Sequence, residues 1–234
     1  MTTIHGGSDA DALGFSTEWD QRYAEGTHLS SWPWTDVVAY THRYALPREA
    51  FRTVLELGCG AGANIPFFAA RGDHYYAIEG SANIVGRLHH RFPDLAGNIV
   101  VGDFTKVIPF SATFDLVVDR GSMTSNDTRS IERCLELVFA RLRSGGLMIG
   151  IDWCTSAHSD ALKGAWVDSH TRRDIDSAML HSLGRIHFSD RTHLLGLLGA
   201  AGFEVTVLEN KTGRMLIGGD GLVRDMFNFV AVKP

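Results

Sequence analysis

The 234-residue sequence predicts an α/β fold, in which helices cover both faces of a mainly parallel sheet. From residue 51 onward, short apolar runs alternate with longer amphipathic runs, as in parallel strands joined by crossover helices. The last two strand-like runs follow one another with no helix between them, which predicts an antiparallel hairpin at one edge of the sheet. With 44% apolar and 21% charged residues, the chain has enough apolar material for a sizeable core.

Two helices are predicted ahead of this region. The first follows Ser16, a favourable N-cap residue, and ends near Gly26, whereas the second begins at Pro33 and stops before Pro47. Residues 1–15, which precede the first helix, are small and polar, and we expect them to be disordered. The predicted organisation is therefore a disordered start (1–15), a helical lid (16–48) and a main domain (49–234).

The main domain is predicted to alternate strands and helices as far as the closing hairpin. Strands are expected at 52–57, 74–79, 98–103, 114–119, 147–152, 203–209 and 226–233. Helices are expected at 62–72, 81–92, 129–143 and 189–202, the last capped by Ser189 or Asp190. Residues 154–187 show the least periodicity, and we interpret them as an insertion near the ligand-binding end.

The stretch VLELGCGAGAN covers the first strand of the domain and the loop after it, and it is compatible with two cofactors. Gly58, Gly60 and Ala63 fit the G-x-G-x-x-G/A turn that binds dinucleotides. Gly58, Gly60 and Gly62 fit equally well the tighter G-x-G-x-G loop of enzymes that use S-adenosylmethionine (SAM). In either case the ligand is expected beyond the carboxyl ends of the strands.

Glu56 distinguishes between the two cofactors, because it lies two positions before Gly58 at the end of the strand. A dinucleotide would bring its anionic pyrophosphate against this carboxylate, whereas SAM would bring an ammonium and a sulfonium group. A buried glutamate is tolerated when it is paired, and a cationic ligand would pair it. The alternative is that local backbone N–H groups or a basic side chain satisfy Glu56.

Acidic residues also end the next two strands. Glu79 is placed to accept both hydroxyl hydrogens of a ribose diol, which fits NAD and SAM equally. In VVGDF, Asp103 can accept from an adenine amino group, and Phe104 can stack on the adenine ring. The alternatives are a solvated acid at the strand end for Glu79 and an ordinary Gly-Asp turn for Asp103.

The motifs VLELGCGAG, YYAIEGS, VVGDF, FDLVVDRGS, RLRSGGLMIGID and LLGLLGAAGFEVTVLE resemble, in order and spacing, those of class I SAM-dependent methyltransferases over residues 50–234. The resemblance implies a three-layer, Rossmann-like sheet of seven strands in the order 3-2-1-4-5-7-6, with strand 7 antiparallel. It also implies methyl transfer from SAM, by in-line displacement, to an oxygen, nitrogen or sulfur atom of a small molecule such as a sugar or natural-product intermediate. By position, the cofactor-binding residues would be Glu56, Gly58, Cys59, Gly60, Gly62, Glu79, Gly80, Asp103, Phe104 and Asp119.

The segment before the main domain is similar, more loosely, to the N-terminal lid of small-molecule methyltransferases of the tellurite-resistance and thiopurine types. Its aromatic residues suit a lid, because ring faces attract a sulfonium and keep water out. The alternative is that they only fix two helices to the sheet. The lid and substrate residues would be Trp19, Tyr23, Trp32 and Trp34, together with Arg120 after the fourth strand and Arg214 in the hairpin connection.

Asp119 and His158 are the candidate catalytic residues. Asp119 would follow the fourth strand near the transferred methyl group, and His158 is the histidine nearest the fifth strand, where a general base would be useful. Asp152 and Asp119 together are similar to the acidic pair of metal-dependent catechol-type methyltransferases. No third ligand is evident, however, and no metal is predicted.

Charge and composition exclude several other classes. The net charge is −5, and no run of Lys or Arg exceeds two residues, so nucleic acid is not an expected partner. The start lacks a signal-peptide pattern, and the three cysteines form no C-x-x-C pair. We therefore expect a cytoplasmic protein with no membrane segment, a monomer or homodimer, whose partner is a small-molecule methyl acceptor. Three other functions stay open: an NAD-dependent oxidoreductase, a SAM-binding protein without catalytic activity, and a protein or RNA methyltransferase.

Overall fold

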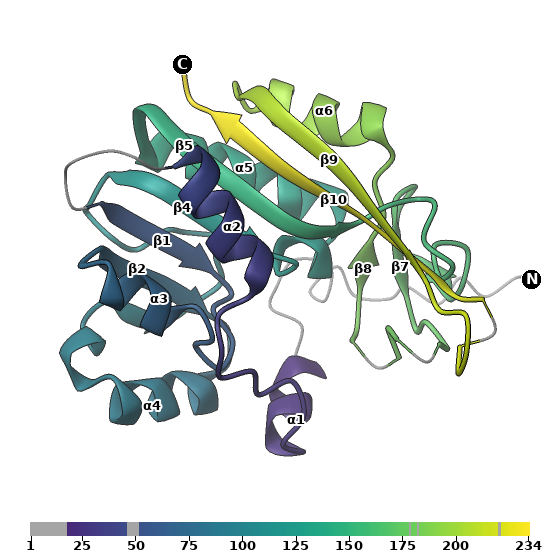
Figure 1. Cartoon of the computed structure of the whole chain (residues 1–234), viewed down its shortest axis with the longest axis horizontal. Coiled ribbons are helices and arrows are strands. Elements are labelled where there is room, and N and C mark those ends of the chain that lie inside the picture. Colours follow the sequence, from purple (N-terminus) through teal and green to yellow (C-terminus); the bar gives the residue numbers. More distant parts are fainter. Residues whose placement is uncertain (1–17, 46–51, 178, 182, 220) are drawn as a thin grey trace, which may run out of the picture.

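The computed structural model of the chain describes residues 18–45, 52–177, 179–181, 183–219 and 221–234. The predicted disordered start (1–15) and the predicted N-cap Ser16 lie outside the described residues. The described part contains a large sheet with helices on both faces, a small second sheet, and two helices that precede the large sheet in the chain (Figure 1).

The main sheet has seven strands, in the predicted order. They are β1 (Thr53–Leu57), β2 (His74–Glu79), β3 (Ile99–Val101), β4 (Phe114–Arg120), β5 (Leu142–Cys154), β9 (Glu204–Arg214) and β10 (Val223–Val232). They lie in the order β3-β2-β1-β4-β5-β10-β9, and the pairs from β3 to β5 are parallel. β10 is antiparallel to both β5 and β9. The Rossmann-like order 3-2-1-4-5-7-6 with an antiparallel seventh strand is therefore confirmed.

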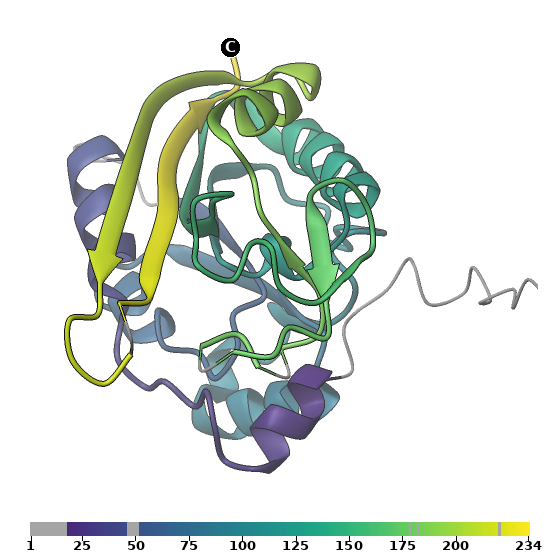
Figure 2. The same ribbon diagram turned by 90° about the vertical axis from the view of Figure 1, so that its right-hand side faces the viewer.

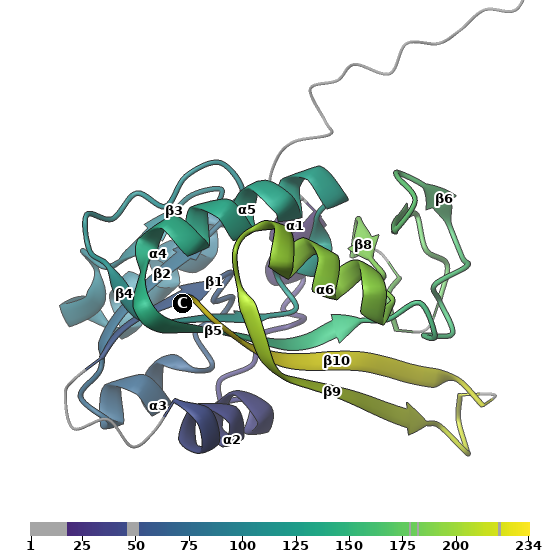
Figure 3. The same cartoon turned by 90° about the horizontal axis from the view of Figure 1, so that it is seen from above.

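Five helices form the outer two layers: α2 (Thr35–Tyr44), α3 (Ile65–Ala70), α4 (Ala82–Arg91), α5 (Thr128–Arg141) and α6 (Arg191–Ala200). α1 (Glu18–Ala24) lies apart from them (Figure 1). α2, α3 and α4 pack Val37, Phe68 and Leu88 into one apolar core with β1 and β2. α5 and α6 pack Leu135 and Leu198 into a second core on the opposite face, and Figure 3 shows them across the sheet from α2 and α3.

Side-chain caps fix where three of these helices begin. The Ser81 hydroxyl accepts from the N–H of the residue three positions on and starts α4. Asp127 caps α5 in the same way, and Asp190 caps α6. Such caps satisfy N–H groups that have no partner inside the helix. Of the two cap residues predicted for the last helix, Asp190 is the one used.

The insertion at 154–187 contains a small sheet that its sequence did not predict. Its strands are β6 (Ala165–Trp166), β7 (Thr171–Arg173) and β8 (Ile186–His187), paired antiparallel in that order. Strands of two or three residues are too short to show a repeating apolar pattern. The insertion also buries a third apolar cluster, which includes Leu180, Leu183 and Ile186.

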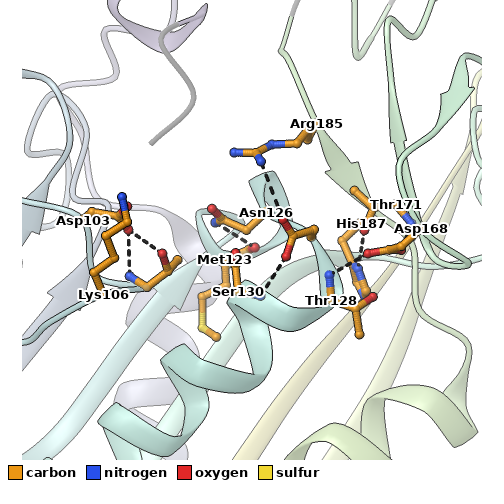
Figure 4. Close-up of polar contacts among 12 residues, drawn as sticks. Asp103, Lys106, Met123, Asn126, Thr128, Ser130, Asp168, Thr171, Arg185 and His187 are labelled. Carbon is orange, nitrogen blue, oxygen red and sulfur yellow. Dashed lines mark hydrogen bonds and ion pairs between the residues drawn. The ribbon is translucent and has the colours of Figure 1, made fainter. Parts of the chain in front are cut away.

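The insertion is fastened to the N-terminal end of α5 (Figure 4). The Asp168 carboxylate accepts from the backbone N–H of Thr128 at 2.8 Å and from that of Thr171 at 2.7 Å. An ion pair between Arg185 and Asp127, at 3.7 Å, joins the two segments again. A carboxylate at a helix N-terminus is favoured by the helix dipole, so these contacts fix the insertion beside the ends of β4 and β5.

The closing hairpin is longer than predicted. The sequence predicts a connection over residues 211–222, but the ladder of β9 and β10 continues to the pair Arg214 and Val223. β5 also begins earlier, at Leu142, where the sequence predicted a helix through residue 143. Because Met226 of β10 pairs with Cys154, the turn of the hairpin lies at the carboxyl end of β5. The hairpin therefore reaches the end of the sheet where ligands are expected.

Candidate active site

A cavity of about 700 Å³ opens at the carboxyl ends of the central strands. Its lining includes Glu56 from the end of β1, Glu79 from β2, Arg120 from β4 and Asp152 from β5. α1, the insertion and the β9–β10 hairpin lie at the same end of the molecule (Figure 2), and each adds lining residues. The volume falls in the range of about 300–1,000 Å³ that is usual for small-molecule sites.

The glycines of the loop after β1 differ in which neighbours they approach. Gly58 has a φ of +61°, and a Cβ there would lie 2.4 Å from the Cβ of Ser122, so a side chain would collide with the loop after β4. Gly62 has a φ of +78°, and a Cβ there would lie 2.6 Å from Leu88 of α4. Gly60, with a φ of +51°, lines the cavity. Gly62 does not line it and instead allows the loop to pack on α4.

Glu56 lies in the cavity wall and is held by neutral groups. Asn64 Nδ2 donates to its Oε1 at 2.7 Å, and the Tyr75 hydroxyl donates to its Oε2 at 2.5 Å. Burial raises the pKa of Glu56 to about 7, although both hydrogen bonds act against the rise. Both donors are neutral side chains, not the backbone N–H groups or the basic side chain considered as the alternative, and neither neutralises the carboxylate.

The acids after β2 and β3 also face the cavity. Glu79 accepts from the N–H of Gly60 at 2.8 Å and from that of Ser81 at 3.0 Å, and burial raises its pKa. Each Glu79 oxygen has a second lone pair available for a ligand. Asp103 accepts from the backbone and hydroxyl of the residue two positions on, and Lys106 lies 3.3 Å from its other oxygen (Figure 4). Phe104 lines the cavity beside it.

Asp119 does not reach the cavity, which corrects its predicted placement beside the methyl group. Its side chain has no exposed surface. It accepts from the N–H groups of Ser122 and Met123, from the Ser122 hydroxyl, and from Trp153 Nε1 at 2.6 Å. Its carboxylate therefore holds the turn after β4. Arg120, the next residue, points into the cavity because successive side chains of a strand face opposite ways.

His158 also lies outside the cavity lining, which corrects its predicted position near the reacting groups. It is 3% exposed, and its Nδ1 accepts from the backbone N–H of Asp160 at 3.1 Å. Its ring packs 6.0 Å from that of Phe188. His158 is nearest to β5 in sequence, but its side chain is buried within the insertion and does not face the cavity. This geometry supports a structural role.

Of the remaining candidates, Trp32 and Arg214 do not line the cavity, and Trp32 is 82% exposed. The hairpin instead contributes Lys211 and Arg224, which sequence reasoning missed. The sequence predicts Lys211 in the connection over residues 211–222 and Arg224 ahead of the last strand, so neither residue was expected in a strand. The predicted residues that do line the cavity are Trp19, Tyr23, Trp34, Glu56, Gly58, Cys59, Gly60, Glu79, Gly80, Asp103, Phe104 and Arg120.

An ion pair and an aromatic ring also line the cavity. Arg120 pairs with Asp152 at 2.7 Å, and the Arg120 guanidinium lies 3.7 Å from the centroid of the Trp34 ring. Asp152 has a φ of +58°, an uncommon conformation for a residue other than glycine, and its N–H donates to Asn228 Oδ1. The lining also includes apolar residues of the insertion and the hairpin: Met179, Leu180, Leu183, Ile186 and Met226.

In the described ranges no three His, Cys, Asp or Glu side chains lie close enough together to hold a metal ion. Nor does any helix of those ranges combine the length and apolar character needed to cross a bilayer.

Comparisons with known proteins agree with this geometry. A family model described as a methyltransferase domain matches residues 27–208. No curated protein matches the sequence. Similar solved structures include a SAM-dependent methyltransferase from Methanosarcina mazei, with a TM-score of 0.64 and 18% identity over 86% of this chain and 98% of that one.

Two further solved structures have the same fold. CcbJ methyltransferase from Streptomyces caelestis has a TM-score of 0.64 and 17% identity over 95% of this chain and 99% of that one. TehB from Haemophilus influenzae has a TM-score of 0.61 and 14% identity over 92% of this chain and 67% of that one. The resemblance to class I methyltransferases is confirmed: the chain belongs to the methyltransferase-domain family and is a SAM-dependent methyltransferase.

Proposed function

We propose that the protein transfers the methyl group of SAM to an oxygen, nitrogen or sulfur atom of a small-molecule acceptor. The observation that carries this proposal is one continuous cavity lined by chemically different residues, which we assign to a donor half and an acceptor half. The donor half contains the buried acids Glu56 and Glu79. The acceptor half contains the Arg120–Asp152 ion pair and the apolar residues of the insertion.

The residues of the donor half fit SAM. Glu56 offers a buried carboxylate held by neutral donors, which suits the ammonium of the methionine part. Gly58 and Gly60 bring the backbone close without side chains. Glu79 offers both oxygens to the ribose hydroxyls. The remaining proposed contacts are Cys59 and Gly80 along the same loops, and Asp103 and Phe104 for the adenine.

The acceptor half would align the acceptor and exclude water from it. SAM supplies a methyl carbon already activated by positively charged sulfur, so the protein mainly orients the acceptor and excludes water. Trp19, Tyr23 and Trp34 of the N-terminal segment line the cavity and suit a lid. Where the accepting atom carries a proton, we propose Asp152 to hold that proton, because its carboxylate is 32% exposed within the acceptor half.

A small molecule fits this cavity better than a macromolecule. The insertion, the hairpin and the lid each line the acceptor half, so the space is bounded on several sides. Its walls combine Met226 and the insertion's apolar residues with the charged pair Arg120 and Asp152. We therefore propose an acceptor with an apolar body and at least one polar group.

An acceptor screen tests the proposal. Purified protein, SAM and pools of small-molecule alcohols, amines and thiols are incubated, and formation of S-adenosylhomocysteine is measured. The expected result is acceptor-dependent release of S-adenosylhomocysteine, which Arg120→Ala lowers and the exposed Arg214→Ala leaves unchanged. Tight SAM binding without transfer to any pool would contradict the proposal and favour a non-catalytic SAM-binding protein. Stabilisation by NADH but not by S-adenosylhomocysteine would instead favour the oxidoreductase, whose pyrophosphate Glu56 should repel.

A further inference from the structure

Asn64 occupies the N-cap position of α3, yet its side chain does not cap the helix. Asparagine is favoured at N-caps because its side-chain oxygen accepts from free N–H groups of the first turn. Here the residue is 2% exposed, and both ends of its amide are used elsewhere. Nδ2 donates to Glu56 Oε1 at 2.7 Å, and Oδ1 accepts from the backbone N–H of Trp34 at 3.0 Å.

These two partners fix the direction of the Asn64 amide. If the amide were reversed, Nδ2 would face the N–H of Trp34, and Oδ1 would face the Glu56 carboxylate. Both contacts would then be repulsive, because an N–H group would meet an NH₂ group and a carbonyl would meet a carboxylate. Asn64 therefore forms a directed bridge from the wall of the donor half to the N-terminal segment.

Trp34 carries the bridge on into the acceptor half. It is the residue before α2, and its ring covers the Arg120 guanidinium at 3.7 Å. Arg120 in turn pairs with Asp152 at 2.7 Å. An unbroken series of contacts thus joins the two halves of the cavity, through Glu56, Asn64, Trp34, Arg120 and Asp152.

Donor binding should strengthen the first contact of this series. A cation beside Glu56 favours the ionised form of its carboxyl group. The hydrogen bond from Asn64 then becomes charge-assisted, and such bonds are shorter and stronger than those between neutral groups. The amide of Asn64 is held more firmly as a result, with its oxygen toward Trp34.

We infer that Asn64 is a positioning residue that couples binding of the methyl donor to the seating of Trp34 over Arg120, so that the acceptor half is completed when the donor is bound. The inference rests on the proposed donor half at Glu56. Coupling of this kind is reciprocal, so loss of the Trp34–Asn64 hydrogen bond must also weaken donor binding.

The first test compares Trp34→Pro with Trp34→Ala. Trp34 has a φ of −70°, close to the fixed φ of proline, so proline removes the N–H group with little change of backbone. Both variants lose the indole, and only Trp34→Pro loses the donor to Asn64. We expect S-adenosylhomocysteine to bind Trp34→Pro about fivefold more weakly than Trp34→Ala in calorimetric titrations. In an Asn64→Ala background this difference in affinity should vanish. A purely structural effect of proline would persist there.

Hydrogen exchange gives a second readout if Trp34→Pro folds poorly. S-adenosylhomocysteine should slow amide exchange in residues 34–38 of the wild type several-fold, and should not do so in Asn64→Ala, where the 58–62 loop is still protected. Asp36→Asn is the matched control, because it weakens the ties of α2 to Lys211 and Asn228 but keeps the Trp34–Asn64 bond. In Asp36→Asn, S-adenosylhomocysteine should still slow amide exchange in residues 34–38.

Two results would overturn the inference. One is equal binding by the proline and alanine variants, or a difference that persists without Asn64. The other is ligand-dependent slowing at residues 34–38 in Asn64→Ala. If the wild type itself fails to bind S-adenosylhomocysteine, the proposed donor half fails, and this outcome is distinct from loss of coupling in a protein that binds.

Discussion

Tyr75 donates a hydrogen bond of 2.5 Å to Glu56, and with Asn64 it holds this carboxyl group beside the cavity by neutral donors. Burial outweighs these bonds and raises the pKa of Glu56 to about 7. A protonated Glu56 cannot pair with the ammonium of the donor. If Glu56 pairs with the donor ammonium as proposed, donor binding at neutral pH depends on the ionisation of this buried side chain.

Affinity for S-adenosylhomocysteine should rise with pH through this pKa. In the free protein Glu56 is mostly protonated at pH 6 and mostly ionised at pH 7.5, given a pKa of about 7. The ligand prefers the ionised form, so we expect binding to tighten by roughly five- to tenfold across this interval. Calorimetric titrations at several pH values measure the change. Glu56→Gln should bind weakly with a flat profile, and a flat wild-type profile would show that Glu56 does not contact the ammonium.

Asp119→Asn should reduce stability rather than catalysis. The buried carboxylate accepts from Ser122, Met123 and Trp153, and an amide would turn a donor toward one of these donors. Leaving buried donors unsatisfied costs about 1–3 kcal/mol each. We expect urea titrations to show a free energy of unfolding lower by about 2–4 kcal/mol, with the affinity of the folded protein for S-adenosylhomocysteine within about threefold of wild type. Unchanged stability with lost turnover would restore the catalytic role predicted from the sequence.

The histidines of the insertion should make the protein sensitive to acid. Burial, with the adjacent His193, lowers the pKa of His187 to about 3. His187 bonds Thr171 Oγ1 through Nδ1 at 3.0 Å, and its Nε2 lies 3.2 Å from that of His193. The Asp168 carboxylate opposes the shift without cancelling it. The folded state therefore keeps His187 neutral while the unfolded chain takes up a proton.

Because the folded pKa of His187 lies below its unfolded value of 6.5, its contribution to stability is complete above pH 6.5 and is lost as pH falls. Urea unfolding should show about 2 kcal/mol lost from this group between pH 7 and pH 5. His187→Gln should be less stable than wild type at pH 7, but its free energy of unfolding should fall less as the pH is lowered. His181→Gln changes an exposed histidine of the same insertion and should keep the wild-type slope. An identical slope in His187→Gln would refute the assignment.

The fold and the donor half could be predicted because local patterns determine them. Alternating strands and helices gave the main sheet, and the hairpin without a helix gave its antiparallel edge. Glu56, Glu79 and Asp103 lie at or just beyond the carboxyl ends of three parallel strands, so their position at one edge of the sheet follows from topology.

The acceptor half could not be predicted in the same way. Asp119 and Arg120 are neighbours in sequence, and only the pleat of β4 decides that the arginine faces the cavity. The side chains of the insertion depend on strands of two or three residues. Asn64 ends the glycine-rich loop and could have been read as a helix cap, yet its use depends on Trp34, thirty residues earlier in the chain.

Calorimetric titration of S-adenosylhomocysteine into wild type and Glu79→Ala tests the central claim, that the cavity beyond β1 and β2 holds the methyl donor. We expect one site per chain in the wild type and at least about tenfold weaker binding in Glu79→Ala, since a lost charge-assisted bond costs roughly 1.5–3 kcal/mol. Equal affinity of the two proteins, or binding of NADH in place of S-adenosylhomocysteine, would contradict the account.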